Sequence, residues 1–279
     1  QEQYFARSLN YHGQHSLKLG GEFDYTTMTG AFDFRSILIR RQNQTLSQRI
    51  DFAGRTSLNR PLGELGAFVQ DRWTVNTNLT VDAGLRLDRN SISRQTDISP
   101  RLSILYRPFK DDRTIVRAGV GLFYDRSPLQ SRYFELGNLN DDDELLDDTG
   151  LATSSHPNFP GRVVTTYALD GTTIIDGPRS FTNVVRTPLR DAHSARWSVQ
   201  VDRSLAKHLT LRLGYVRRST KNEPIIFPKL NNTGGGLLVL KSRGQSNYHE
   251  FQALALYDSQ RFHNWNVSYV WSRAKGSLN

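Results

Sequence analysis

His193 and Ser194 place an imidazole base beside a hydroxyl nucleophile, a combination that hydrolytic enzymes use. The two residues are adjacent, however, and the alternating pattern around them predicts a strand. Neighbouring side chains of a strand point to opposite faces, so the imidazole and the hydroxyl cannot meet. We therefore interpret both as ordinary residues at the start of a strand. The sequence predicts a protein that is not an enzyme.

A second cluster whose residue types could do chemistry is the acidic run at 138–148, NLNDDDELLDD. Clustered carboxylates can hold Ca²⁺, but the EF-hand spacing with its glycine and terminal glutamate is absent. A solvated acidic loop is therefore the favoured interpretation. The sequence has no cysteine, which excludes disulfides and thiolate metal sites, and we expect neither a metal nor a cofactor. The carboxylates of the run are Asp141, Asp142, Asp143, Glu144, Asp147 and Asp148.

The segment 63–89, GELGAFVQDRWTVNTNLTVDAGLRLDR, shows which elements must position the polar residues. Apolar and polar residues alternate on both sides of VNTN at 75–78, which supplies turn chemistry. Two residues break the alternation: Asp71 falls among the apolar positions and Phe68 among the polar ones. A period of two indicates strands with one apolar and one polar face. The segment is predicted to be a β-hairpin.

The same alternation recurs in roughly ten predicted strands, which are joined in turn by short turns and long loops. Within the second long loop, RVVTTYALDGTTIID predicts a small hairpin with a turn at Asp170-Gly171. Residues 247–257 are apolar at both odd and even positions, so the sequence does not decide which of them lie on the apolar face of the strand. Membrane barrels have short periplasmic turns and long outer loops. The long loops are expected at about 26–61, 126–195 and 217–246.

Large aromatic residues occupy apolar positions at both ends of the predicted strands. Two aromatic belts around an aliphatic band are typical of a lipid-facing barrel wall, because amphipathic rings prefer headgroup depth. A soluble sandwich would instead concentrate its large rings in the middle of its strands. The predicted fold is therefore all-β, an antiparallel transmembrane β-barrel portion. Trp73, Tyr106 and Trp265 fall near the short turns, and Tyr25, Tyr124, Trp197, Tyr215 and Trp271 fall near the opposite edge.

Composition agrees with this fold and argues against other classes. Hydrophobic residues make up 37% of the 279 residues, and no run approaches the roughly 20 apolar residues of a spanning helix. The net charge of +9 comes from Lys and Arg scattered over the chain rather than gathered in one patch, so no nucleic-acid partner is expected. Basic residues near the outer rim are expected to pair with anionic headgroups of outer-membrane lipid and lipopolysaccharide.

Several segments together resemble a TonB-dependent outer-membrane receptor. They are GAFVQDRW, LTVDAGLRLDR, SPRLSILYRP, TIVRAGVGLFYDR, NYHEFQ and NVSYVWSRA. More narrowly, the sequence is similar to the Oar-like branch, which often carries a carboxypeptidase-regulatory-like domain upstream. The resemblance covers most of residues 10–279. It implies the outer membrane of a Gram-negative-type bacterium as the location.

The resemblance also implies a barrel of roughly 22 strands that encloses a plug. The family's plug and TonB box have no counterpart in residues 1–279, and the chain stops where the family continues with more strands. We therefore expect residues 1–279 to be part of one barrel domain, a fragment whose open edges need further strands. The expected partners are the plug domain of the same full-length chain and the TonB system, reached through the missing N-terminal part.

Two functions remain open at this point. The resemblance implies active uptake of a bulky ligand of unknown identity; the alternative is a passive porin or a surface adhesin with the same wall. Charges on the polar parity are expected to face the lumen, where they contact substrate or plug or are solvated. These candidate residues are Arg86, Arg101, Arg117, Arg212 and Asp82.

Overall fold

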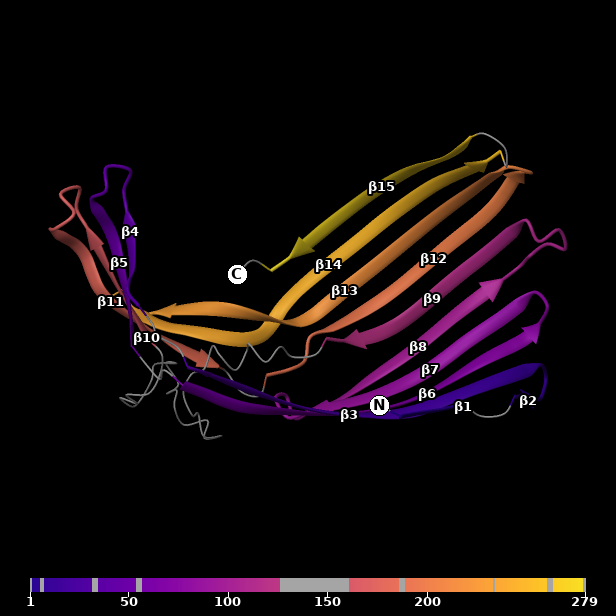
Figure 1. The fold of residues 1–279 in the computed structure, drawn as a ribbon, viewed down its shortest axis with the longest axis horizontal. Coiled ribbons are helices and arrows are strands. Elements are labelled where there is room, and N and C mark those ends of the chain that lie inside the picture. The colour runs from indigo at the N-terminus through magenta and orange to yellow at the C-terminus, as the bar shows by residue number, and fades with distance from the viewer. Residues whose placement is uncertain are drawn as a thin grey trace.

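The computed structural model describes residues 2–5, 8–31, 35–53, 57–125, 161–185, 189–232, 234–259 and 263–277. These residues form one 15-stranded sheet that is curved and open (Figure 1). The described part of the chain contains no helix that is long and apolar enough to cross a membrane. The acidic run at 138–148 lies outside the described residues, as does the whole segment 126–160.

Most of the sheet is an antiparallel meander, which we call the wall. Each wall strand pairs with its neighbours antiparallel, as the alternation predicts. The short turns lie together at one end of the wall (Figure 1). The wall comprises β1 (Glu2–Phe5), β2 (Leu9–Asn10), β3 (Gln14–Ala31), β6 (Ser57–Asn76), β7 (Leu79–Asn90), β8 (Thr96–Tyr106), β9 (Thr114–Tyr124), β12 (His193–Ala206), β13 (Leu209–Leu230), β14 (Gly236–Asp258) and β15 (Asn264–Gly276).

The hairpin predicted at 63–89 is confirmed as β6 and β7. Asn76 ends β6, and its Oδ1 accepts hydrogen bonds from the backbone N–H groups of Asn78 at 2.8 Å and Leu79 at 2.9 Å. An asparagine side chain that bonds to the backbone two and three residues ahead stabilises a tight turn. The register that results places Val69 opposite Leu85 on the apolar face. All later positions on the two strands follow from that register.

Four further strands form a second part of the sheet, which we call the lobe (Figure 1). They are β4 (Ile37–Arg40), β5 (Leu46–Ala53), β10 (Gly161–Tyr167) and β11 (Ile174–Val185). Their spatial order is β11-β10-β5-β4, and β11 joins the lobe to the wall by a parallel pairing with the first residues of β14. An all-antiparallel meander was predicted, so this one parallel contact is a departure from that prediction.

The predicted small hairpin is confirmed as β10 and β11. Asp170 Oδ1 accepts the backbone N–H groups of Thr172 and Thr173, each at 2.9 Å, and Gly171 has φ of 74°. The Thr173 hydroxyl and those N–H groups hold the pKa of the Asp170 carboxyl well below its usual range. Glycine suits the left-handed conformation because it has no Cβ.

Arg41 ties the two hairpins of the lobe together. Its guanidinium donates to three backbone carbonyls: Leu46 O at 2.7 Å, Ala168 O at 2.9 Å and Tyr167 O at 2.6 Å. Charged donors make stronger hydrogen bonds than neutral ones. The β4–β5 turn and the end of β10 are therefore held at a fixed distance.

Two of the segments expected as long loops are largely strand. In 26–61, β3 continues to Ala31, β4 and β5 form a hairpin, and β6 already begins at Ser57. In 217–246, β13 and β14 continue as a long hairpin that turns at 231–235. The described residues form fifteen strands where roughly ten were predicted. The additional ones are the four strands of the lobe, and the first strand of the wall is divided into the short β1 and β2.

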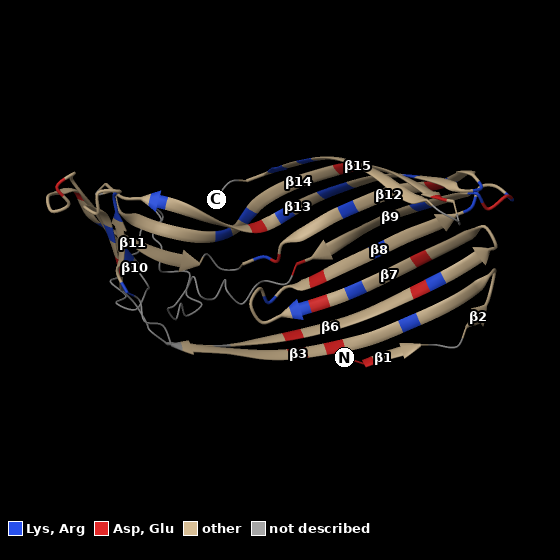
Figure 2. Cartoon of the chain, turned by 45° about the horizontal axis from the view of Figure 1, so that its top comes forward, with Lys and Arg blue, Asp and Glu red and all other residues tan. Residues whose placement is uncertain are grey.

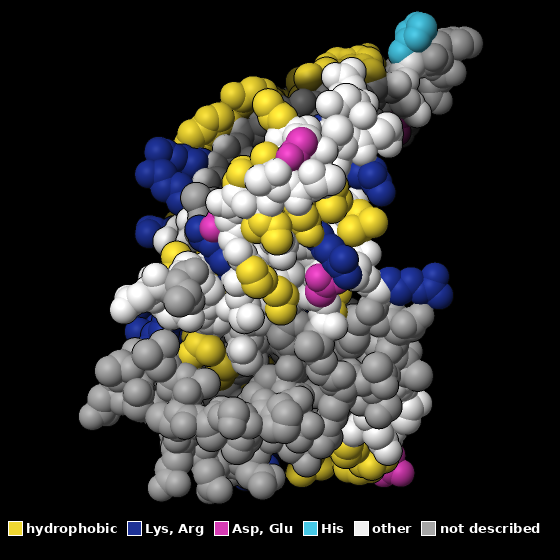
Figure 3. Space-filling view, turned by 90° about the vertical axis from the view of Figure 1, so that its left-hand side faces the viewer, with side chains coloured by type: hydrophobic (Ala, Val, Ile, Leu, Met, Phe, Trp, Pro, Cys, Tyr) yellow, Lys and Arg dark blue, Asp and Glu magenta, His cyan; other side chains and the backbone are white. Residues whose placement is uncertain are grey.

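Fully buried apolar side chains lie where the lobe meets the wall. Val239, on β14, is 1% exposed and packs with Val184 of β11 and Leu237. Here β14 has a neighbour on each side, β13 and β11, so its side chains are shielded. Along the wall, by contrast, large apolar residues such as Leu85 and Val267 are exposed at 41% and 60%. The lobe end itself shows apolar and basic side chains intermixed (Figure 3).

Spin labels on neighbouring positions test the assignment of the two faces. Labels at Leu85 and Val267 in a bilayer should be accessible to lipid-soluble oxygen and shielded from a water-soluble nickel complex, because these positions face hydrocarbon. Labels at Gly84 and Ser268, one residue earlier or later, should show weaker oxygen access. Equal shielding of Leu85 and Val267 from both relaxants would mean that a protein core covers them.

Candidate functional site on the polar face

Charged residues occur along nearly every strand of the wall (Figure 2). The register brings residues from neighbouring strands to one level: Arg101 lies opposite Gly84 on β7 and opposite Gly121 on β9. Likewise Asp202 of β12 lies opposite Arg212 of β13. All five charges predicted for the lumen lie on this polar face.

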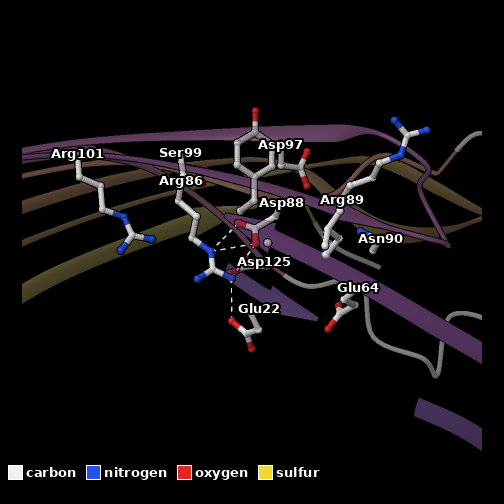
Figure 4. A pocket seen from close by; sticks show the side chains of 13 residues that line it. Glu22, Glu64, Arg86, Asp88, Arg89, Asn90, Asp97, Ser99, Arg101 and Asp125 are labelled. Atoms are coloured by element: carbon white, nitrogen blue, oxygen red, sulfur yellow. Dashed lines mark hydrogen bonds and ion pairs between the residues drawn. The ribbon is translucent and has the colours of Figure 1, made fainter. Parts of the chain in front are cut away.

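Arg86 is held between two carboxylates. Its Nε donates to Asp88 at 2.8 Å and 2.9 Å, and its Nη2 lies 3.2 Å from Glu22 Oε2 (Figure 4). The guanidinium passes over Gly66, where a Cβ would stand only 2.9 Å from Arg86 Nη2 and 2.8 Å from Asp88 Oδ1. A side chain at Gly66 would therefore have to displace the ends of Arg86 and Asp88. The predicted lumen charge Arg86 is neutralised.

The pocket around this cluster has a volume of about 290 Å³. It lies at the loop end of β7, β8 and β9, and it is lined mainly by acids and arginines (Figure 4). Its acidic lining residues are Glu22, Glu64, Asp88, Asp97 and Asp125.

A second cluster centres on Asp202, which is 8% exposed. Its carboxylate lies 2.5 Å from Arg117 Nη1 and 2.8 Å from Arg212 Nε, and Gln200 Nε2 donates to it at 3.0 Å. One carboxylate thus serves two arginines from the strands on either side. Arg117 and Arg212 were predicted as candidate residues, but Asp202 was missed. The available signal was that Asp202 falls on the polar face of a strand predicted between those of Arg117 and Arg212.

Asp82, the one acid among the predicted lumen charges, is also paired. Arg72 Nε donates to Asp82 Oδ1 at 2.7 Å, and the two residues lie directly opposite each other on β6 and β7. Cross-strand pairs of opposite charge stabilise a sheet. Among the described residues, therefore, four of the five predicted charges sit in ion pairs.

Arg101 differs from the other four. No carboxylate among the described residues lies within ion-pair distance of it, and its guanidinium instead stacks over the Phe123 ring at 4.6 Å. It extends alongside Arg86 in the pocket of Figure 4. Of the predicted candidates, it is the one best placed to meet an incoming anion.

A buried acid pair lies at the loop end of β8. Asp97 is 5% exposed and Asp191 is 2% exposed, and the two carboxyls share a hydrogen bond. Asp191 also accepts hydrogen bonds from Ser93 Oγ and from Asn90 Nδ2, the latter at 2.9 Å. These contacts attach the residues after β11 to the β7–β8 loop.

Burial raises the pKa of Asp97 to about 7, and the nearby Asp191 and Asp88 carboxylates add to the effect. Asp97 precedes Ile98–Tyr106, which is long enough to cross the membrane, so the pair lies outside the crossing part. A carboxyl whose folded-state pKa is raised favours the folded state in its protonated form. The contribution is largest at acidic pH and is lost as pH rises toward 7.

The aromatic residues predicted as lipid belts all lie on the apolar face. Trp73, Tyr106 and Trp265 lie at the end of the short turns, and Trp265 stacks on Tyr257 at 5.3 Å. Whether these rings reach lipid headgroups stays a prediction. The other members lie toward the opposite end: Tyr25, Tyr124, Trp197, Tyr215 and Trp271.

Asp71, which breaks the apolar pattern, has a partner on the neighbouring strand. His15 Nδ1 lies 2.6 Å from Asp71 Oδ2, and the imidazole stacks on Trp73 at 5.4 Å. His15 Nε2 also lies 3.1 Å from the carbonyl of Tyr11. The polar residue is thus accommodated by a charge-assisted contact at the edge of the apolar band.

His193 and Ser194 point apart, as the sequence predicts. Ser194 Oγ hydrogen-bonds to Thr220 Oγ1 at 2.9 Å, while the His193 ring lies against Tyr124 at 5.2 Å on the other face. Within the described ranges, no group of three or more His, Asp or Glu residues is arranged to hold a metal ion.

The raised pKa of Asp97 predicts a pH-dependent attachment of residues 189–192. Their amide exchange, corrected for intrinsic rates, should accelerate between about pH 4 and 7 in the wild type and level off above pH 7, because detachment releases the Asp97 proton over this range. Asp97→Asn keeps a donor to Asp191 at every pH and should abolish that acceleration. The same pH dependence in both proteins would contradict the assignment.

Two protein-family models match the chain. The model for the TonB dependent receptor-like β-barrel matches residues 1–145, and that for an outer membrane beta barrel domain matches residues 88–278. Each covers more than half of the sequence. No curated protein sequence matches the chain.

Solved structures of outer-membrane transporters share the fold. The outer membrane transporter YddB from Escherichia coli is 13% identical with a TM-score of 0.66, covering 98% of this chain and 33% of its own. The siderophore receptor PirA from Pseudomonas aeruginosa is 11% identical with a TM-score of 0.52, covering 94% and 47%. The FrpB iron transporter from Neisseria meningitidis is 10% identical with a TM-score of 0.52, covering 98% and 35%.

The chain spans between a third and a half of the length of these three structures. At these identities the likeness concerns the fold alone. The family models identify receptors and transporters of the outer membrane rather than enzymes, and the Oar-like branch within them stays a prediction. From its matched models and its antiparallel wall, the chain belongs to the family of TonB-dependent receptor-like β-barrels of the outer membrane.

Proposed function

We propose that this chain is part of one barrel domain of a ligand-gated importer that takes up a bulky ligand across the outer membrane. The observation that carries the proposal is the arrangement of charges on the polar face. They form ion-pair clusters around Arg86, Asp82 and Asp202, while Arg101 has no carboxylate partner among the described residues and can bind an anionic ligand. A lining of this kind suits a water-filled or plugged lumen. The neighbours PirA, a siderophore receptor, and FrpB, an iron transporter, support uptake by analogy of fold.

The proposed partners follow from the same architecture. A plug domain in the full-length chain would face the polar side of the wall, and the TonB system would act through that plug. Arg217 and Arg273 follow Tyr215 and Trp271 on the apolar face, toward the lobe. Guanidinium groups just beyond an aromatic belt suit the phosphates of lipopolysaccharide.

Planar-bilayer conductance of the full-length protein tests gating. A gated importer should show little steady conductance, because a plug blocks the lumen. Removal of the plug should open a large conductance and serves as the positive control. A large, steady conductance in the intact protein would favour a passive porin and contradict the importer.

The lobe is proposed to be extracellular and to meet the ligand first. It lies at the end of the wall opposite the short turns, and Leu169 at its β10–β11 turn is 79% exposed (Figures 1 and 3). A protease site inserted after Leu169 should be cut on intact cells. A site inserted at Lys110 in the β8–β9 turn should be protected, and the reverse pattern would invert the proposed orientation.

A further inference from the structure

Three arginines occupy one level of the polar face, below the pocket around Arg86. Arg101 lies opposite Gly121, Gly121 lies opposite Arg196, and Arg196 lies opposite Arg218 on the next strand. Like charges placed directly opposite each other destabilise a sheet. Glycine in the interior of a strand also weakens it, and often marks a place that a ligand approaches closely. This level therefore carries two local costs to stability.

Four other arginines on the polar face have carboxylate partners among the described residues, and these three do not. The four are Arg72, Arg86, Arg117 and Arg212. Within the described residues, no carboxylate lies within ion-pair distance of Arg101, Arg196 or Arg218. Glu250, one level away, feels the charge of Arg196, but its oxygens accept hydrogen bonds from Tyr248 and Gln252. The level retains an excess of positive charge.

A hollow of about 400 Å³ opens between Arg101 and Arg196. Three glycines, Gly84, Gly119 and Gly121, line it, so backbone rather than side chains forms much of its floor. Ser198 supplies a hydroxyl donor. The Arg72–Asp82 ion pair also lines the hollow, and Ser103 Oγ donates to Asp82 Oδ2 at 3.5 Å. The volume falls in the range of small-molecule sites, and guanidinium groups with hydroxyls are the donors that bind carboxylate and phosphate.

Phe123 gives the hollow an apolar side. Arg101 stacks over its ring at 4.6 Å, and the ring edge stands 3.0 Å from where a Cβ of Gly121 would be. Arg218 lies similarly over Tyr248 at 5.9 Å. Stacking holds a guanidinium against the ring face, while its N–H groups, which lie in the plane of the guanidinium, can still donate to a ligand.

We propose that Arg101, Arg196 and Arg218 form an anion subsite of the lumen for a ligand that bears at least two carboxylate or phosphate groups. One acidic group would bind between Arg101 and Arg196 above Gly121, and a second would lie near Arg218. The subsite deepens the proposed uptake function and rests on it for its physiological role. Binding itself is measured independently of uptake.

Calorimetric titration of the full-length protein in detergent at low salt tests the subsite. The probes are benzene-1,3,5-tricarboxylate and inorganic pyrophosphate, with the neutral trimethyl ester of the tricarboxylate as a blank. Both anions should bind and the ester should not. The anion that binds more tightly shows whether the subsite prefers carboxylate or phosphate. Arg101→Gln and Arg196→Gln should each weaken binding about tenfold or more, because each removes charge-assisted hydrogen bonds. Added salt should weaken binding.

Two matched controls separate the subsite from general charge and folding effects. Lys110→Gln removes an exposed charge from the β8–β9 turn, at the end of the wall away from the lobe, and should leave binding unchanged. Gly121→Val should block binding, since a Cβ there stands 3.0 Å from Phe123 and 3.2 Å from Arg101 Cγ. Gly214→Val, where the nearest atom is 3.8 Å away, should bind as the wild type does.

Stability supplies a readout that does not need a ligand. Arg196→Gln relieves the repulsion with Arg218, so this variant should unfold at a temperature no lower than the wild type. Added tricarboxylate should raise the unfolding temperature of the wild type and not that of the variant. Unchanged affinity in both arginine variants, or no binding of either anion, would overturn the subsite. Binding without uptake would contradict the importer and leave the subsite standing.

Discussion

Backbone hydrogen bonding between neighbouring strands is the interaction on which the rest of this structure depends. In hydrocarbon no water can satisfy an unpaired N–H or C=O, so each wall strand must pair along its length. Pairing fixes the register, and the register commits each residue to one of two faces. Leu85 faces the apolar side because Arg86 and Gly84 face the polar side, and neither choice can be altered alone. The chemistry of the lumen is therefore set by the same bonds that hold the wall together.

Charge on the polar face is balanced locally rather than over the whole face. Asp202 lies between Arg117 and Arg212 because the three residues come from three consecutive strands of the wall, and Asp88 reaches Arg86 from two residues along the same strand. Such clusters are partly exposed and screened, so each contributes modestly to stability. Their main effect is to hold the side chains in defined positions. Against that background the row from Arg101 to Arg218 carries its charge unopposed, which makes it the part of the face most responsive to an anion.

The faces and the β6–β7 hairpin could be predicted from the sequence, because period-two alternation depends only on neighbouring residues. The strand ends between Arg217 and Gly236 could not, because two prolines in the segment indicate a loop. Beyond Lys221, β13 pairs with β14 on one side and with no strand of the described residues on the other, and proline is tolerated at such an edge. Residues 247–257 have apolar side chains at both odd and even positions, so the sequence alone does not show which of them lie on the apolar face. Strand pairing decides this, because it places Phe251 opposite Tyr215 and Trp271. For the site, parity predicted the arginines, but their partners Asp202 and Glu22 depended on register. The contact between Asp97 and Asp191 joins segments far apart in the chain, and no local pattern encodes it.

The lobe strands lie in two insertions, one between β3 and β6 and the other between β9 and β12. Each insertion leaves and re-enters the meander between strands that are already neighbours, so its length and sequence can diverge without shifting the register of the wall. Recombination at these two junctions can exchange the lobe while the wall is inherited unchanged. The exception is β14, whose first residues pair with β11 and whose later residues pair with β15. Substitutions near Val239 are therefore constrained by both parts at once, and this short stretch should evolve more slowly than the lobe it supports.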